Sequence, residues 1–275
     1  MVRPPQKNYC AMITGASSGI GRSIALQMAQ HARTLILVAR RQARLETLKD
    51  EIKRAHSHVE VIVAPCDLSN IEEIKKMLTS IESQNIDIDV LVNNAGFGDI
   101  AQFADARWDK LEQMLAVNIT APSYLTHALL PGMITRKSGG IMNISSGFAF
   151  TFMPGFATYA ASKMHLSGFS EALALELRSA NVSVTHVCPG PVATEFEAVA
   201  ENPFERSVPS WVALSPERCA KLSVRAFHRG QVMFIPGTMM KLTFALARMT
   251  PTVILRFVYR IVAREFRLSP QESSR

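Results

Sequence analysis

The chain has 275 residues, of which 48% are hydrophobic and 19% charged, so it is long enough for a complete core and too apolar for a disordered protein. Its net charge of +7 is concentrated from Arg229 onward, where eight Lys or Arg face two Glu, which leaves the body close to neutral and disfavours a nucleic-acid-binding surface. Four cysteines without a CxxC pair, no HExxH motif and no secretory leader predict a reduced, cytoplasmic, metal-free protein.

Short apolar runs alternate with amphipathic segments over residues 1–237. This pattern is typical of a Rossmann-type, doubly wound parallel sheet of about seven strands with helices on both faces. Helical stripes such as Leu45, Leu48 and Ile52 are expected to face the core. We expect one catalytic domain over 1–237 and a basic, apolar helical extension over 238–275. The expected strands are 9–14, 34–39, 59–64, 88–93, 140–145, 182–187 and 232–236.

The first expected strand runs directly into a glycine-rich turn, TGASSGIG, with Gly15, Gly19 and Gly21. The spacing of these glycines differs from that of the GxGxxG fingerprint of dinucleotide-binding turns. Glycines after a buried strand nevertheless let the backbone approach a pyrophosphate, and the following helix offers unpaired N–H groups. The turn therefore predicts a dinucleotide site, and an ordinary tight turn is the alternative.

Three cations, Arg40, Arg41 and Arg44, follow the second expected strand. An acidic residue at this place would bind a ribose 2′-hydroxyl, whereas cations suit a 2′-phosphate. Cations in the first turn of a helix also oppose its dipole, and a bound phosphate would offset that cost. The pattern predicts NADP(H) rather than NAD(H), with a solvated basic surface as the alternative.

The pentapeptide YAASK places Tyr159 and Lys163 one helical turn apart, on the same face. A phenol needs a pKa lowered by about three units to exchange protons near pH 7. One ammonium at ~4 Å and an effective dielectric of ~20 supplies about that much. The pair is a candidate proton donor, although Tyr and Lys often share a helix face without any chemistry.

Four segments in this order resemble the short-chain dehydrogenase/reductase family over about residues 8–237: TGASSGIG, NNAG (93–96), YAASK and PGPVAT (189–194). The resemblance implies that Tyr159 is the acid/base and that Lys163 lowers its pKa and holds the nicotinamide ribose. It implies that Ser146, 13 positions before the tyrosine, orients the substrate carbonyl in preference to Ser145. Asn118 would anchor a water-linked proton path to the lysine.

The same resemblance implies a cofactor-binding set. Asp67 would meet the adenine, Asn93 would support the site and Thr194 would bind the carboxamide. Structural roles are the alternatives: Asp67 as an N-cap for a helix starting near Asn70, Thr194 as a turn residue, Ser146 as a helix cap and Asn118 as a satisfied buried amide. The full expected set is Gly15, Ser17, Ser18, Gly19, Ile20, Gly21, Arg40, Arg44, Asp67, Leu68, Asn94, Ala95, Gly96, Tyr159, Lys163, Pro189, Gly190, Val192 and Thr194.

The segment between Ser146 and Tyr159 is rich in phenylalanine, which favours an apolar ligand. Core or subunit contacts are the alternative for these rings. This segment, which holds Phe148, Phe150, Phe152, Met153 and Phe156, is expected to line the pocket, and Phe97 and the segment 195–211, with Phe196, Phe204 and Trp211, could form further walls or a lid. The predicted pocket residues are Phe97, Phe148, Phe156 and Phe196.

Residues 251–267 read as a basic amphipathic helix with Arg256, Arg260 and Arg264 at every fourth position. This pattern resembles an interfacial membrane helix, and packing on the domain or on a second subunit is the alternative. The sequence as a whole predicts an NADP(H)-dependent carbonyl reductase or alcohol dehydrogenase for a hydrophobic small molecule, assembled as a dimer or tetramer. A non-catalytic cofactor sensor or a membrane-associated assembly protein is the rival interpretation.

Overall fold

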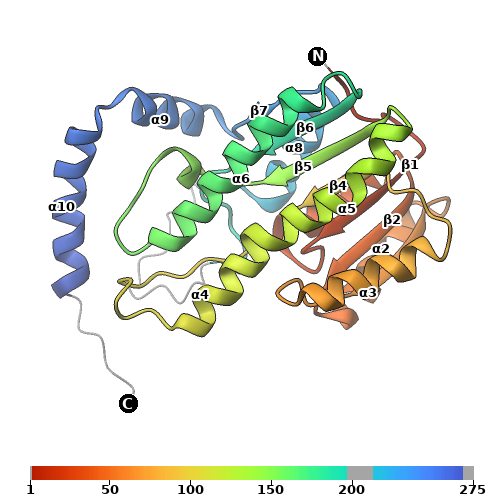
Figure 1. Cartoon of the computed structure of the whole chain (residues 1–275), viewed down its shortest axis with the longest axis horizontal. Coiled ribbons are helices and arrows are strands. Elements are labelled where there is room, and N and C mark those ends of the chain that lie inside the picture. The colour runs from red at the N-terminus through yellow and green to blue at the C-terminus, as the bar shows by residue number, and fades with distance from the viewer. Residues whose placement is uncertain (1, 197–212, 269–275) are drawn as a thin grey trace.

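A computed structural model of the chain describes residues 2–196 and 213–268, so the predicted lid residues Phe204 and Trp211 lie outside the described part. The strands form one parallel sheet of seven in the order β3-β2-β1-β4-β5-β6-β7. The predicted Rossmann-type architecture is therefore confirmed (Figure 1). The strands are β1 (Tyr9–Thr14), β2 (Ala32–Ala39), β3 (Glu60–Pro65), β4 (Val90–Asn93), β5 (Gly139–Ile144), β6 (Val182–Val187) and β7 (Met233–Phe234).

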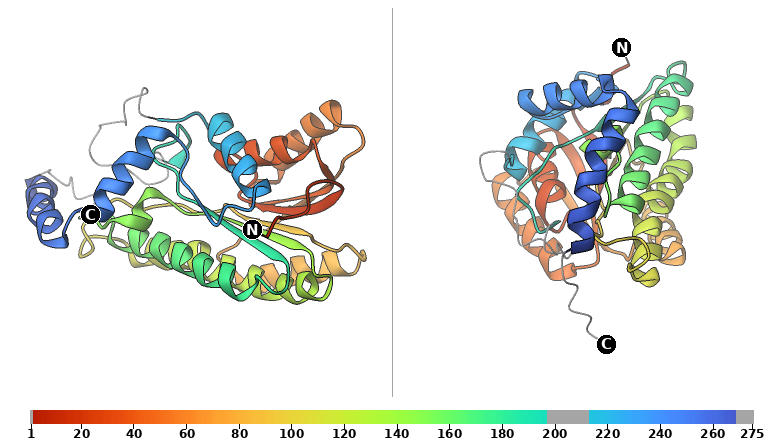
Figure 2. Two further views of the ribbon diagram at one scale, coloured as in Figure 1. Left: turned by 90° about the horizontal axis from the view of Figure 1, so that it is seen from above. Right: turned by 90° about the vertical axis from the view of Figure 1, so that its left-hand side faces the viewer.

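Helices cover both faces of the sheet (Figure 2). Side chains alternate along the strands, so that Ala11 and Ile13 enter a core with α1, α2 and α8, whereas Cys10 and Met12 enter a core with α3, α5 and α6. The helices are α1 (Gly19–Met28), α2 (Gln42–Ala55), α3 (Ile71–Glu82), α4 (Trp108–Leu115), the π-helical turn η1 (Ala116–Thr120), α5 (Ala121–Thr135), the 3₁₀ turn η2 (Gly147–Phe150), α6 (Ala157–Glu176), α8 (Pro216–His228), α9 (Thr238–Met249) and α10 (Thr252–Leu268).

The predicted core stripes are correct, since Leu45, Leu48 and Ile52 are all buried on α2. The strand predicted over 88–93 begins only at Val90. Asp89 still bonds to both neighbouring strands, since its N–H donates to the carbonyl of Cys10 at 2.9 Å and its carbonyl accepts from Gly140 at 2.9 Å. The backbone N–H of Cys10, however, donates to a carboxylate oxygen of Asp89 at 2.8 Å. A side chain thus takes the role that a strand carbonyl would otherwise have.

The sheet order reverses between β1 and β4, which are hydrogen-bonded neighbours. In doubly wound sheets the loops at the carboxyl ends of such strands diverge and leave a crevice for ligands. Here those loops are the glycine turn after β1 and the NNAG segment at the end of β4. The fold therefore brings these two segments together at one edge of the sheet.

Candidate active site

The turn after β1 is held in a conformation that requires glycine. Gly15 has a φ of +65°, and a Cβ there would lie 2.8 Å from the side-chain nitrogen of Asn94 and 2.9 Å from the Cα of Ala95. A Cβ at Gly21 would collide with Asn94 and with the carbonyl of Gly15. The first turn of α1 and the NNAG segment therefore approach as closely as backbones can.

Asn94 ties the NNAG segment to the glycine turn. Its side-chain nitrogen donates to the carbonyls of Thr14 at 2.9 Å and Gly15 at 3.3 Å, and its backbone N–H donates to the Thr14 hydroxyl at 2.9 Å. Asn93 faces the other way. Its side-chain amide donates to Asn143 at 2.8 Å and to Thr126 at 3.3 Å inside the core. These hydrogen bonds hold the end of β4, and thereby the NNAG segment, from the side of the core.

Tyr159 is buried near the start of α6, with 6% of its surface exposed, and its hydroxyl is hydrogen-bonded to Ser146. Burial raises the pKa of Tyr159 to about 12, and the hydrogen bond with Ser146 opposes that rise. The lowered pKa expected from Lys163 is therefore not found in this structure, because the cost of burying a phenolate outweighs the effect of its neighbours.

Lys163 lies on the same side of α6, with its Nζ 5.8 Å from the centre of the Tyr159 ring. The ammonium donates to the carbonyl of Ile144 at 3.1 Å, and a Cβ on Gly96 would lie 3.1 Å from it. Burial lowers the pKa of Lys163 to about 8. An ammonium held so close to the NNAG backbone is placed to reach both the phenol and a ligand in the crevice.

The π-helical turn η1 presents Asn118 to this group. The Asn118 carbonyl oxygen accepts from the backbone N–H of Phe97 at 3.2 Å, and its amide donates to the carbonyl of Phe97 at 3.0 Å and to the hydroxyl of Ser162 at 3.1 Å. Single π turns inside helices often occur at functional sites. The side-chain amide of Asn118 is therefore buried with its hydrogen bonds satisfied. It also links η1 to Phe97, which follows the NNAG segment, and to Ser162 on α6.

The structure separates the roles of the two adjacent serines. Ser145 is buried against α6, where its hydroxyl donates to the carbonyl of Lys163 at 2.9 Å and pairs with Ser167 at 2.8 Å. Ser146 caps η2 through the backbone N–H of Phe148 at 3.3 Å and contacts Tyr159. The geometry thus agrees with the choice of Ser146, which serves as a helix cap at the same time.

The predicted phosphate-binding cations are engaged by a carboxylate. Glu195 pairs with Arg41 at 2.9 Å and with Arg44 at 2.6 Å, and Arg41 also donates to the hydroxyls of Ser17 and Ser18 at 3.1 and 2.8 Å. These two arginines lower the pKa of Glu195 to about 2. They form an anion-binding group beside the glycine turn, and α2 begins only at Gln42, after Arg40 and Arg41.

The remaining predicted cofactor residues surround the same crevice. Asp67 accepts from the backbone and hydroxyl of Ser69 at 3.0 and 2.8 Å, whereas the N-cap of α3 is Asn70, so the alternative role of Asp67 as that cap is wrong. Thr194 accepts from the backbone N–H of Phe196 at 3.2 Å, and its methyl lies beside Gly19. The carbonyl of Pro189 accepts from Gly147 at 2.8 Å. The PGPVAT segment therefore lies between the glycine turn and η2, the turn that follows Ser146.

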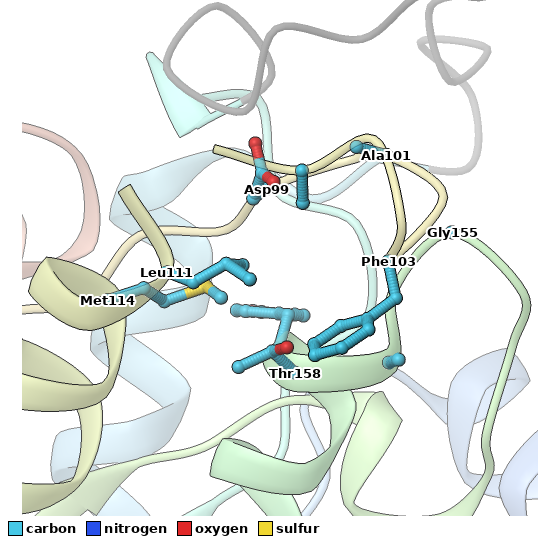
Figure 3. A pocket seen from close by; sticks show the side chains of 10 residues that line it. Asp99, Ala101, Phe103, Leu111, Met114, Gly155 and Thr158 are labelled. Atoms are coloured by element: carbon cyan, nitrogen blue, oxygen red, sulfur yellow. The ribbon is translucent and has the colours of Figure 1, made fainter. Parts of the chain in front are cut away.

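Aromatic rings enclose Tyr159. The rings of Phe196, Phe148 and Phe156 lie 5.3, 5.6 and 6.5 Å from it, and Phe97 packs against the same cluster. All four predicted pocket residues are thus brought together around the phenol. A cavity of about 10 Å³, roughly the room for one water, lies beside Tyr159 and is lined by Asp99, Leu111 and Met114 from the segment around α4 (Figure 3).

Sequence reasoning missed the contribution of α9. A Cβ on Gly147 would collide with the ring of Phe244, and one on Gly190 would lie 2.5 Å from the sulfur of Met240. Phe150 and Phe152 turn toward this side, where their rings lie 5.6 Å from Phe244 and 5.4 Å from Tyr259 of α10. The spacing of Met240 and Phe244, four residues apart, was the available signal.

Comparison with known proteins agrees with this geometry. The sequence profile described as short chain dehydrogenase matches residues 9–203. A short chain dehydrogenase of Pseudocercospora fijiensis is 37% identical over 68% of this chain, and the match spans only 61% of that relative. An 11-beta-hydroxysteroid dehydrogenase-like protein of Arabidopsis thaliana is 34% identical over 88% of this chain and 78% of its own length.

Two further similarities bear on chemistry. A fatty acyl-CoA reductase of Acinetobacter baylyi is 33% identical over 90% of this chain and 83% of its own length. Among solved structures, a short-chain dehydrogenase from Sphingobium yanoikuyae in complex with NADPH superposes with a TM-score of 0.75 and 26% identity, covering 97% of this chain and 98% of that one.

Proposed function

Because the chain belongs to the short-chain dehydrogenase family of oxidoreductases, we propose that it transfers a hydride between NADP(H) and a hydrophobic carbonyl or alcohol. The observation that carries the proposal is that Ser146, Tyr159 and Lys163 come together at the carboxyl end of β5, with the Nζ of Lys163 5.8 Å from the centre of the Tyr159 ring. These three groups lie near the glycine turn after β1, which we call the cradle, where a Cβ at Gly15 or Gly21 would come within 3 Å of Asn94 or of backbone atoms.

The residues present suit a bound nicotinamide dinucleotide. The turn from Gly15 to Gly21 and the N-terminus of α1 would hold the pyrophosphate. Lys163 and Asn118 lie against Gly96, where a ribose would sit between the NNAG segment and α6. When bound, the reduced nicotinamide supplies the hydride.

The catalytic side chains handle the proton. In reduction, the carbonyl carbon gains a hydride while the Tyr159 hydroxyl gives its proton to the carbonyl oxygen, which leaves an alcohol and a tyrosinate. Ser146 donates a hydrogen bond to the same oxygen as negative charge builds on it. The ammonium of Lys163 stabilises the tyrosinate, and Asn118 positions the path that restores its proton. Oxidation of an alcohol is the reverse sequence.

Preference for NADP(H) rests on Arg41 and Arg44, which already hold one carboxylate beside the cradle. A 2′-phosphate carries more negative charge than a carboxylate and has more acceptor oxygens. The solved relative named above contains NADPH, which supports this choice.

A hydrophobic substrate is favoured by the four phenylalanines around Tyr159. Relatives named for a hydroxysteroid and for a fatty acyl-CoA accord with an apolar carbonyl compound of that size. A homo-oligomer remains our expectation for the assembly, and a cytoplasmic location remains our expectation for the cell.

The decisive test compares wild type with Tyr159→Phe in NADPH consumption against aldehydes and ketones of increasing chain length. We expect the variant to lose about 10²- to 10⁴-fold in kcat, while fluorescence titration gives an unchanged Kd for NADPH. Unchanged turnover in the variant would refute the assigned role. If wild type binds NADPH but reduces no member of the panel, the non-catalytic sensor becomes the better interpretation.

A further inference from the structure

The helix α10 leaves most of its apolar side chains outside the domain. Its inner side holds the half-buried Leu255 and Tyr259, and the Tyr259 hydroxyl is hydrogen-bonded to Thr151 at 2.8 Å. This contact fixes which side of the helix faces the body. Figure 1 and the left-hand view of Figure 2 show α10 at one end of the molecule, away from the sheet.

The opposite side of α10 continues onto α9 as an exposed apolar surface, which we call the terminal apolar surface. On α10, Val253 and Phe257 are 74% and 65% exposed, and on α9 Met249 is 81% exposed. More than half of the large apolar side chains that are exposed in the described part of the chain lie on these two helices. The terminal apolar surface comprises Met239, Leu242, Leu246, Met249, Val253, Ile254, Phe257, Val258 and Ile261.

Positive charge borders this surface. Residues 238–268 contain six Lys or Arg and one Glu, a net charge of +5 out of the +7 of the whole chain. Arg256 and Arg260 are exposed and lie one turn apart, on the α10 flank between Tyr259 and Phe257. An apolar face with a flanking cationic stripe is the composition of a helix that lies in the headgroup region of a membrane.

The charge distinguishes between possible occupants. If a second copy of the chain docked through the same surface, two segments with a net charge of +5 each would face one another. Their electrostatic repulsion opposes such a symmetric contact. A nucleic acid would match the charge and leave the apolar residues uncovered. An anionic bilayer matches both, since its headgroups attract each nearby Lys or Arg by about 1 kcal/mol and its acyl region takes the apolar side chains. No helix in the described ranges 2–196 and 213–268 has the length and hydrophobicity to cross a membrane.

We propose that the terminal apolar surface docks the protein on the face of an anionic membrane. The inner sides of the same helices contact the catalytic loop, through Phe244 on Gly147 and Tyr259 on Thr151. Docking would therefore place the lipid next to the wall of the site. This consequence, the capture of an apolar carbonyl from the bilayer, rests on the proposed function, whereas the docking itself does not.

The test is co-sedimentation of the full chain with sucrose-loaded vesicles of phosphatidylcholine alone or with 30% phosphatidylserine. We expect binding to the anionic vesicles that weakens as salt rises from 50 to 500 mM. Phe257→Ser with Ile261→Ser should reduce the partition coefficient at least tenfold, and Leu175→Ser, at an exposed apolar side chain on α6, should leave it unchanged.

The cationic stripe has its own matched control. Arg256→Gln with Arg260→Gln should weaken binding about tenfold or more, whereas Lys76→Gln with Arg178→Gln, which removes the same charge from exposed positions elsewhere, should change it less than twofold. The assay of vesicle binding does not depend on turnover, so membrane docking and NADPH-dependent reduction can fail independently of one another. The proposal is overturned if the wild-type protein does not bind anionic vesicles, or if the two double charge variants weaken binding equally. It is also overturned if Phe257→Ser with Ile261→Ser instead dissociates an oligomer in analytical ultracentrifugation.

Discussion

The glycine turn after β1, which is the cradle, and the helices α9 and α10, which we call the wall, both pack against segments that carry predicted site residues, but they are built in different ways. At Gly15 and Gly21 the atoms that a Cβ would meet include backbone atoms and the side-chain amide of Asn94, which donates two hydrogen bonds. At Gly147 and Gly190 they belong to the ends of flexible side chains on α9. A rigid surface suits a ligand of fixed shape, and an adaptable one suits a range of apolar ligands.

The largest contrast is expected from adding one methyl group to the cradle. Gly21→Ala forces Asn94 and the Gly15 carbonyl to move, so we expect a loss of about 3 kcal/mol in the free energy of unfolding and loss of NADPH binding. Urea denaturation and fluorescence titration measure the two effects. Gly168→Ala on α6, where a Cβ meets nothing within 4 Å, is the control and should stabilise by about 0.5–1 kcal/mol. Equal effects of the two changes would contradict the contrast.

Lys163 lies beside the NNAG segment, against Gly96, and its titration should appear in the free energy of unfolding. Its pKa is lowered by burial from 10.5 to about 8, so between these pH values the unfolded chain holds more protons than the folded one. Stability contributed by this group therefore rises with pH across that window, by at most about 3 kcal/mol.

The measurement is the free energy of unfolding of wild type minus that of Lys163→Met, from urea titrations between pH 7 and 10.5. This difference should grow with pH, since the buried charge is a cost only while the amine is protonated. Burial also raises the pKa values of Tyr159, Cys10, Cys66 and Cys219, and these groups titrate in both proteins, so their contributions cancel in the difference. A flat difference would show that the ammonium is better solvated than its burial indicates.

A smaller effect is expected at the adaptable wall. Gly147→Ala pushes on the ring of Phe244, which can shift with α9, so we expect about 1 kcal/mol of destabilisation. The KM for apolar carbonyls should change several-fold while the Kd for NADPH stays constant. Adding Phe244→Leu to this variant should restore part of the loss in a double-mutant cycle. Additive effects would indicate that the two residues do not share the contact.

The smallest expected change sharpens the description of the cradle. Glu195 competes with a 2′-phosphate for Arg41 and Arg44, so Glu195→Gln should lower the Kd for NADPH by roughly 3- to 10-fold, in the range of exposed ion pairs. The Kd for NADH, which lacks that phosphate, should change less than twofold. Isothermal titration calorimetry gives both values. Equal tightening of both cofactors would mean that Glu195 acts on the shared part of the nucleotide.

The cradle could be predicted from sequence, and the wall largely could not. Strand periodicity and close glycines are local signals, so β1, the turn after it and the spacing of Tyr159 and Lys163 were readable in the chain. The approach of Phe244 to Gly147 joins residues nearly a hundred positions apart, and only the packing of α9 creates it. The raised pKa of Tyr159 is likewise a property of burial, which one helix face does not reveal.

The π-helical turn η1 also makes this part of the chain sensitive to the deletion of a residue. It accommodates one residue more than regular α-helical winding would over this stretch. Deleting one residue between Ala116 and Thr120 would let α4 continue into α5 as an α-helix, and it would shift the backbone that carries Asn118. The amide of Asn118 would then lose its hydrogen bonds to Phe97 and Ser162.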